Sequence, residues 1–359
     1  MLDFIKEAVS VWDTLRQAKK PIVIYGMGNG ADKILYWCEG NDVQISGIFA
    51  SDEFVRGQKF RGFTVEKYDD LCLRLGKELL VVIAFASERP EVLTRFAELA
   101  EEQQVVAPHL PLFNETELVS FDWIEKYSAE LQQAYDLLAD EQSRKVFADV
   151  LNYKLSGKIK YLFNCATQRL DDLRELVALS KNENYLDLGA YTGDTINEFG
   201  KLTAWQWEGI TAVEPDRRNC RKLRSLAQEL ELKGLAVDVY EMGIWDECGE
   251  LLFSDDGGRQ STFLGNKKCS VPVTTIDNAA AGKNISFIKM DVEGAEIQAL
   301  NGGRQTLSHL KPKLFIAAYH YDVDLFRIPL LLDKLVPEYR IYLRKHPYVP
   351  AWELNYICK

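Results

Sequence analysis

The sequence predicts an α/β protein with two parallel sheets, and three observations lead to this prediction. Short apolar runs alternate with amphipathic helical segments in two series, over residues 1–112 and residues 181–359. Each series opens on an apolar run that leads into a glycine-rich turn. A length of 359 residues with 47% apolar side chains is enough for two separate cores. We therefore expect two α/β domains, joined by residues 113–180.

The first series has the element order of a parallel α/β unit. An apolar strand at residues 22–25 leads through GMGNGA into an amphipathic helix with Ile34, Leu35 and Trp37, and then into a strand at residues 43–50. A strand at residues 80–86 and a helix at residues 89–102 continue the alternation. Beyond it, apolar residues recur at helical spacing without a strand signal, which predicts a helical connector over residues 113–180.

The second series is longer and predicts a larger sheet. Strands are expected at residues 185–188, 210–214, 237–244, 285–291, 314–320, 340–343 and 354–358. Alternating runs between residues 250 and 277, around a turn at residues 256–258, predict an inserted hairpin. Arg259, Gln260 and Ser261 of this segment are expected to meet substrate or cofactor. The two last strands are expected to form an antiparallel pair at the sheet edge.

Charge and composition exclude several classes of partner. With 54 acidic and 43 basic residues, the net charge of −11 argues against nucleic acid or an anionic membrane. No apolar stretch nears the roughly 18 residues of a membrane span. The first 20 residues are unlike a secretory signal, and the seven cysteines are scattered without a C-x-x-C pair. We expect a cytoplasmic protein with reduced thiols.

The segment YLDLGAYTGDT is the most informative part of the chain. An apolar strand containing Asp187 runs into Gly189 and Gly193 and then into a polar helix start, the arrangement that holds a nucleoside-bearing cofactor. Tyr191 occupies the place where a dinucleotide fingerprint has its second glycine, which points to a cofactor without phosphates. Glu214 follows Asp187 by 27 positions, the length of a βαβ repeat, at the end of the next strand.

Four blocks in this order resemble the FkbM family of S-adenosylmethionine-dependent methyltransferases. They are YLDLGAYTGDT, AVEPD at residues 212–216, VTTID at residues 273–277 and IKMDVEGAEIQALNGG at residues 288–303. The resemblance implies a class I methyltransferase domain with a seven-stranded, Rossmann-like sheet over residues 181–359. It also implies S-adenosylmethionine as cofactor and methyl transfer to a hydroxyl of a saccharide or related metabolite.

Under this resemblance each block has a role in cofactor binding. The helix start after Gly193 favours the methionine carboxylate, Asp187 accepts from its ammonium group directly or through water, and Glu214 accepts from both ribose hydroxyls. The third strand is expected to end where Gly243 and Ile244 flank the adenine. The full set is Asp187, Gly189, Ala190, Tyr191, Gly193, Asp194, Thr195, Glu214, Pro215, Gly243 and Ile244. Taken singly, these are also ordinary helix caps, turn glycines and strand-end acids.

Catalytic candidates lie at the ends of the fourth and fifth strands, where Asp291 ends the fourth and His320 the fifth, and these carboxyl ends meet beside the cofactor. Asp291 and Glu293 lie in DVEGAE, and His320 ends AAYH with the pKa range of a general base. We expect His320 to take the hydroxyl proton first, with Asp291 or Glu293 orienting it or replacing it. Alternatives remain for each: Asp291 as a helix cap, His320 as hydrogen-bonded packing, or all three as ligands of a divalent ion, with the metal unknown.

Two neighbouring residues receive no catalytic role from the sequence. Glu296 lies one helical turn beyond Glu293 and is expected to be a surface acid. Lys289 is expected to point away from the neighbours of Asp291.

The first domain carries a glycine motif of its own. Gly26, Gly28 and Ala31 have the G-x-G-x-x-A spacing after a strand, and Asp52 lies past the second strand, so they form a possible nucleotide site. The stretch GIFASDEFVRGQKFRGFTV resembles the small Rossmann-like domain of PglD-type sugar acetyltransferases, which handles nucleotide sugars. The alternative is a scaffold that keeps its glycines for packing alone.

These observations predict a methyltransferase that acts on a small molecule or a saccharide, free or nucleotide-linked. Two rivals remain open. The first is a nucleotide-dependent oxidoreductase that uses the site from Gly26 to Asp52, although no partner for a nicotinamide is evident. The second is a non-catalytic nucleotide-sugar-binding partner protein. The acceptor and the oligomeric state are left open by the sequence.

Overall fold

The computed structural model describes residues 2–113, 117–254 and 268–359, and the chain forms two compact units. Unit 1 contains Met1–Ser128, Arg144–Thr167 and Lys345–Glu353. Unit 2 contains Ala129–Ser143, Gln168–Arg344 and Leu354–Lys359. Both units are α/β, as predicted. Among the described residues, no helix combines the length and apolarity that a bilayer crossing requires.

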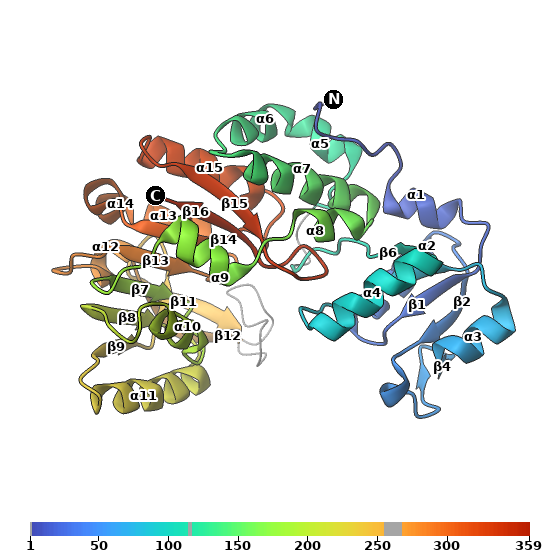
Figure 1. Ribbon diagram of the computed structural model, residues 1–359, viewed down its shortest axis with the longest axis horizontal. Coiled ribbons are helices and arrows are strands. Elements are labelled where there is room, and N and C mark those ends of the chain that lie inside the picture. The colour runs from blue at the N-terminus through green and yellow to red at the C-terminus, as the bar shows by residue number, and fades with distance from the viewer. Residues whose placement is uncertain (1, 114–116, 255–267) are drawn as a thin grey trace. The chain divides into compact units, whose positions relative to one another are not determined.

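Unit 1 holds a six-stranded sheet with the order β3-β4-β2-β1-β5-β6. Neighbouring strands are parallel except for β3 and β4, which form an antiparallel pair. Figure 1 shows β1, β2 and β4 of this sheet. The strands are β1 (Ile22–Tyr25), β2 (Ile45–Phe49), β3 (Lys59–Phe60), β4 (Phe63–Glu66), β5 (Leu80–Ile83) and β6 (Gln104–Val106). The helices that accompany them are α1 (Val11–Arg16), α2 (Asn29–Gly40), α3 (Tyr68–Leu75) and α4 (Pro90–Glu102).

The central strands of unit 1 are buried on both faces, as expected of a parallel sheet. All four residues of β1 and of β5 are buried. Helix α2 turns one apolar face toward this core, with Ile34, Leu35 and Cys38 buried, because these residues recur at helical spacing. The first α/β series therefore forms where the apolar pattern predicts it.

The segment between the two sheets is helical. It contains α5 (Phe121–Lys126), α6 (Ser128–Asp136), α7 (Glu141–Ser156), α8 (Lys160–Cys165) and α9 (Arg169–Asp172), followed by a π-helical turn at Leu173–Val177. Residues 144–167 of this segment belong to unit 1, whereas residues 129–143 and 168–177 belong to unit 2. The predicted connector is thus helical, and its helices are part of the two units.

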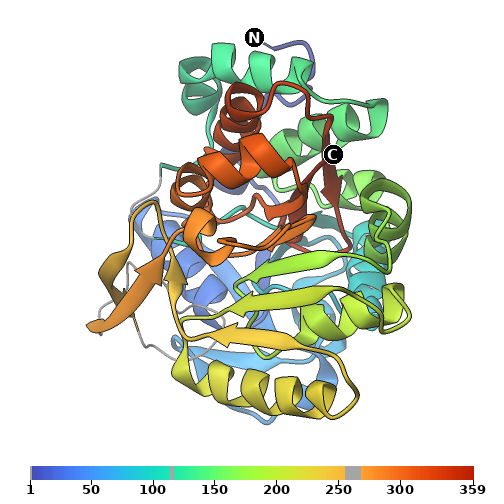
Figure 2. The same cartoon turned by 90° about the vertical axis from the view of Figure 1, so that its left-hand side faces the viewer.

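Unit 2 holds a seven-stranded sheet with the order β15-β16-β14-β13-β7-β8-β9. Figure 2 shows β7, β8 and β9 side by side, with α11 (Arg217–Glu231) along the outer strand. Strand β16 runs antiparallel to β14. The strands are β7 (Asn184–Leu188), β8 (Gly209–Val213), β9 (Val237–Tyr240), β13 (Phe287–Met290), β14 (Lys313–Ala317), β15 (Ile341–Lys345) and β16 (Leu354–Cys358). The remaining helices are α10 (Asp194–Leu202), α12 (Ile276–Ala279), α13 (Glu296–Asn301), α14 (Arg304–Leu310) and α15 (Asp324–Leu335).

Three strand predictions need correction. The third strand of the second series, expected over residues 237–244, is divided: β9 stays in the main sheet, whereas β10 (Gly243–Ile244) pairs with β12 (Lys268–Thr274) in a separate three-stranded sheet. The fourth and fifth strands end at Met290 and Ala317, so that Asp291 and His320 follow the strands instead of ending them.

The two strands of the predicted inserted hairpin are present. Strand β11 (Gly249–Ser254) pairs antiparallel with β12, which continues the three-stranded sheet. The predicted turn at residues 256–258, together with Arg259, Gln260 and Ser261, lies outside the described residues.

Candidate functional site

The glycine turn after β7 brings the backbone of two strands into close approach. Gly189 has φ +77°, and a Cβ atom on it would lie 1.8 Å from the carbonyl oxygen of Asp291, which follows β13. Gly193 has φ +91° and is the N-cap of α10, where a Cβ would lie 2.4 Å from Leu226. Tyr191 between them also has positive φ and is 40% exposed. Backbone conformation therefore favours glycine at both positions, and at Gly189 the backbone of Asp291 also leaves no space for a side chain.

Asp187 is wholly buried beneath this turn. Its Oδ2 accepts a hydrogen bond from Thr195 Oγ1 at 2.5 Å, and its Oδ1 lies 3.6 Å from Lys289 Nζ. Burial raises the pKa of Asp187, and Lys289 and Thr195 oppose that effect. The carboxylate therefore holds two side chains in place, and its contact with a ligand stays a prediction.

Lys289 is a site residue that sequence reasoning missed. The expectation that it points away from this region is wrong, because its buried ammonium group donates to the carbonyl oxygen of Gly189 at 2.9 Å. Although burial opposes it, the negative charges of Asp187 and Asp291 raise the pKa of Lys289. Strand alternation alone places this side chain on one face of β13, but the distance to Gly189 depends on the pairing of β13 with β7. The one available signal is a lysine inside an apolar strand, which needs a buried anion.

Glu214 follows β8 and ties the surrounding backbone together. Its Oε2 accepts from Tyr191 N at 2.9 Å, and its Oε1 accepts from Asp216 N at 2.9 Å and from Asn219 Nδ2 at 3.3 Å. Burial raises its pKa to about 7. A carboxylate has about four acceptor sites, so that it can still accept from a ligand.

The remaining predicted cofactor residues lie around the same strand ends. The amide groups of Gly189 and Ala190 both donate to Val213 O, which fixes the turn against β8. Asp194 opens α10, and Pro215 separates Glu214 from Asp216, whose side chain caps α11. Gly243 and Ile244 are buried in β10, directly after Met242, whose amide donates to Glu214 O.

The three predicted catalytic residues come together after β13 and β14. His320 Nε2 lies 3.5 Å from Asp291 Oδ1 and 3.4 Å from Glu293 Oε2. The imidazole is almost fully buried, whereas the side chains of Asp291 and Glu293 are 31% and 38% exposed. Tyr319 Oη donates to Asp291 at 3.2 Å. Asp291 is not the helix cap of the alternative interpretation, since the N-cap of α13 is Ala295.

Glu296 is the fully buried member of this cluster, so the prediction that it is a surface acid is wrong. The side chain is 0% exposed, its Oε1 lies 2.9 Å from His320 Nδ1, and the same oxygen accepts from Val292 N at 3.0 Å. Although burial opposes it, the negative charges of Glu296, Glu293 and Asp291 raise the pKa of His320 well above its usual value. Burial raises the pKa of Glu293. The imidazole is therefore held by one carboxylate and faces two others.

The loop that carries Glu293 has an unusual backbone. Glu293 has φ +54° and Gly294 has φ +95°, so that two successive residues are left-handed. A non-glycine residue in this region costs roughly 1 to 3 kcal/mol and persists where the surroundings enforce it. The turn directs Glu293 toward His320.

The glycine motif of unit 1 is placed differently. Gly26 has φ +118° and packs against Phe85, and a Cβ on Gly30 would lie 2.3 Å from Ala84 O. Gly28 is the N-cap of α2 with open space around it, and Ala31 is buried. Asp52 is exposed and pairs with Lys67 at 3.2 Å. A nucleotide site at Gly26, Gly28, Ala31 and Asp52 stays a prediction.

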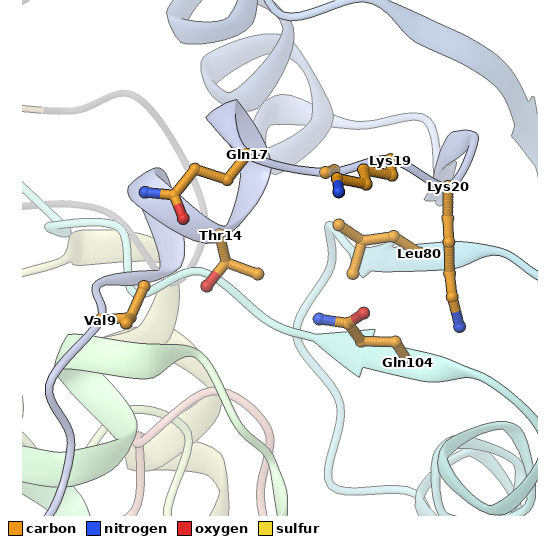
Figure 3. A pocket seen from close by; sticks show the side chains of 8 residues that line it. Val9, Thr14, Gln17, Lys19, Lys20, Leu80 and Gln104 are labelled. Carbon is orange, nitrogen blue, oxygen red and sulfur yellow. The ribbon is translucent and has the colours of Figure 1, made fainter.

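The larger of the two pockets described lies elsewhere in unit 1. It has a volume of about 320 Å³ and includes the side chains of Lys19 and Lys20 (Figure 3). Leu80 and Gln104, which also line it, are the first residues of β5 and β6. The pocket is therefore at the amino ends of the strands, whereas ligands of parallel sheets bind at the carboxyl ends. It does not overlap the glycine motif.

Comparison with known proteins agrees with this geometry. Residues 187–350 match the family model described as a methyltransferase FkbM domain. The crystal structure of a methyltransferase FkbM from Methylobacillus flagellatus KT has 21% sequence identity, covers 99% of this chain and 95% of its own, and gives a TM-score of 0.73. A SAM-dependent methyltransferase from Aquifex aeolicus, at 10% identity and a TM-score of 0.33 over 64% of this chain and 97% of its own, is too distant to support an argument. No curated protein matches the chain.

The full-length structural match confirms the predicted fold class, a seven-stranded methyltransferase sheet with a second, smaller α/β unit. The family match covers the glycine turn, Glu214, and the cluster of Asp291, Glu293, Glu296 and His320. S-adenosylmethionine is therefore the cofactor, as predicted. Residues 187–350 form a methyltransferase domain of the FkbM family, and the protein is an S-adenosylmethionine-dependent methyltransferase.

Proposed function

We propose that the enzyme transfers the methyl group of S-adenosylmethionine to a hydroxyl of a saccharide or a related small metabolite. One observation carries this proposal: Asp291, Glu293 and His320 gather at the carboxyl ends of β13 and β14, directly beside the glycine turn. A hydroxyl loses its proton when it is methylated, so the acceptor needs a polar, proton-accepting group near the methyl donor. This cluster supplies such groups.

In this proposal the cofactor lies over the turn between Gly189 and Thr195. The amide groups at the start of α10 face its methionine carboxylate, and the remaining acceptor site of Glu214 takes a ribose hydroxyl. Gly243 and Ile244 flank the adenine. Asp187 acts through Thr195 and Lys289, which it contacts. The absence of phosphates in the cofactor suits Tyr191, whose side chain stands where a dinucleotide site has a glycine.

Glu293 is the residue that we assign to proton removal. His320 was the first candidate from the sequence, but an imidazole whose pKa is raised by three carboxylates already carries a proton near neutral pH. Glu293 is more exposed, and burial raises its pKa toward the pH at which a general base is most effective. His320 then holds Asp291 and Glu293 in position, and Glu296 fixes the ring through Nδ1.

The pair Asp291 and Glu293 also favours a polyhydroxyl acceptor. Both carboxylates are partly exposed on one side of His320, and each accepts hydrogen bonds without donating any. Adjacent hydroxyls of a sugar ring offer two donors to such a pair. A methyl acceptor without hydrogen-bond donors would leave both carboxylates without hydrogen bonds.

The test is methyl transfer from labelled S-adenosylmethionine to defined acceptors. The purified full-length protein is incubated with free saccharides, nucleotide-linked sugars and a small-metabolite extract, and the product is identified by mass spectrometry. We expect a methyl ether on one hydroxyl, and its loss in Glu293→Gln with cofactor binding retained. Transfer to a nitrogen or carbon acceptor, with no hydroxyl modified in any fraction, would contradict the proposal.

A further inference from the structure

We propose that Asp291, Glu296 and His320 form a binding site for a divalent metal cation. The site lies at the carboxyl ends of β13 and β14, in the same cluster as the proposed acceptor position. Its role in methyl transfer rests on the function proposed above, but its existence is tested independently of that function.

The first argument is distance. Each of the three residues offers one ligand atom, and these atoms lie within 4.8 Å of one another. Two ligands on opposite sides of one Mg²⁺ are separated by about 4.2 Å, and around the larger Ca²⁺ by about 5 Å. Ligand atoms at such separations can therefore reach one ion after small side-chain movements.

The second argument is charge. Asp291, Glu293 and Glu296 each place a carboxylate oxygen within 3.5 Å of a ring nitrogen of His320. In the part of the chain that the structure describes, no lysine or arginine forms an ion pair with any of the three. Three carboxylates around one imidazole give this partly buried cluster more negative than positive charge, which is costly. A divalent cation offsets this excess.

An independent observation concerns the second oxygen of Glu296. The side chain is fully buried, and its Oε1 is engaged by Val292 N and His320 Nδ1. Its Oε2 is also buried, and within the described residues it has no hydrogen-bond partner. A buried carboxylate oxygen without a donor is costly to maintain, and a cation is a ligand that satisfies it.

The donor set indicates the kind of ion. Two carboxylates and one imidazole suit Mn²⁺ or Mg²⁺ better than a thiolate-seeking metal. Three protein ligands leave positions for the acceptor hydroxyl, whose acidity such an ion increases. A ligating imidazole is neutral, so His320 releases its proton to solvent when the ion binds. Glu293 is outside the ligand set and remains available to take the proton of the acceptor hydroxyl. Tyr319, which donates to Asp291, keeps that carboxylate oriented.

Binding is measured by titrating the EDTA-treated full-length protein with Mn²⁺ alone and following free Mn²⁺ by electron paramagnetic resonance. We expect one equivalent to bind, and Asp291→Asn and Glu296→Gln to weaken binding at least tenfold. The matched control is Glu338→Gln, a surface acid paired with Lys311, which should bind as the wild type does. Because Glu296 is buried, circular dichroism checks its variant, and the partly exposed Asp291 supplies the second test. Folded wild-type protein without bound Mn²⁺, or unchanged binding by Asp291→Asn, would overturn the site.

A second assay separates this inference from the proposed function. Methyl transfer is compared in EDTA and after addition of Mn²⁺ or Mg²⁺, with the identified acceptor. We expect at least a tenfold increase with the cation. An undiminished rate in EDTA overturns the catalytic role of the ion and leaves the proposed function intact. Mn²⁺ binding that depends on Asp291, without transfer to any hydroxyl, supports the site and overturns the function.

Discussion

The two units carry similar glycine turns with different surroundings. Gly26 in unit 1 and Gly189 in unit 2 both follow a buried central strand and both have positive φ. Gly26 packs against the ring of Phe85, an apolar neighbour. Gly189 packs against the backbone of Asp291, and its carbonyl accepts from the buried Lys289. Both glycines thus have positive φ, but the neighbour is an apolar ring in one unit and a charged site in the other.

The acidic residue after the second strand differs in the same way. The side chain of Asp52 is 67% exposed and pairs with Lys67 at the surface, a contact worth little in energy. Glu214 is 6% exposed and accepts from the backbone of the glycine turn. Glycine spacing therefore indicates a tight turn, whereas buried ionisable groups beside the turn indicate ligand chemistry.

The largest effect is expected in the catalytic cluster of unit 2. Replacing Glu293 with glutamine removes the proposed proton acceptor, and we expect kcat to fall by about 10² to 10⁴. The affinity for S-adenosylmethionine should stay within about twofold, because Glu293 is outside the cofactor set. Steady-state kinetics and calorimetry measure the two quantities. The control is Asp52→Asn in unit 1, which should change neither, and equal losses in both variants would remove the distinction between the units.

Two glycine substitutions, one in each unit, test the comparison through the free energy of unfolding. Gly189→Ala requires a methyl group 1.8 Å from Asp291 O at φ +77°, and we expect a loss of about 3 kcal/mol or more in the free energy of unfolding. Gly28→Ala adds a methyl group where there is open space and φ is −129°, and we expect a change within about 0.5 kcal/mol. Thermal and urea unfolding measure both. Similar stability of the two variants would contradict the close approach of β7 and β13.

A smaller effect is expected from pH. Burial raises the pKa of Glu214 to about 7, so the carboxylate form increases as the pH rises from 6 to 8. If a ribose hydroxyl donates to that carboxylate, affinity for S-adenosylmethionine should increase about tenfold over this range. The same raised pKa stabilises the fold below the usual glutamate pKa, and this contribution is lost as the pH rises through 7. Glu214→Gln should flatten the binding profile, and an unchanged slope in that variant would assign the titration to another group.

Much of the architecture was predictable from apolar periodicity. Strands β1, β5, β7 and β16 begin within one residue of their predicted positions, because buried parallel strands are short apolar runs between turns. The division of the third strand was not predictable. Met242 N bonds to Glu214 O while β10 pairs with β12, and such pairing depends on contacts distant in sequence.

The glycines and the acidic residues of the site could be predicted from the sequence, but the burial of its charged side chains could not. Glu296 opens α13, and a charged residue at a helix start is usually solvated. Its burial follows from the packing of α13 against α15 and from the partner His320, neither of which the sequence displays. The one sequence signal for a buried acid was a histidine after an apolar strand, because a buried imidazole needs a hydrogen-bonding partner.

The most direct test is calorimetric titration of S-adenosylmethionine into the wild type and two variants. We predict that Glu214→Ala weakens binding by about 10²-fold, since the substitution removes a buried acceptor from ribose and from Tyr191 N. We also predict that Gly28→Trp binds as tightly as the wild type, because we place the cofactor in unit 2. Unchanged affinity in Glu214→Ala, or lost affinity in Gly28→Trp, would contradict the placement of the cofactor in unit 2.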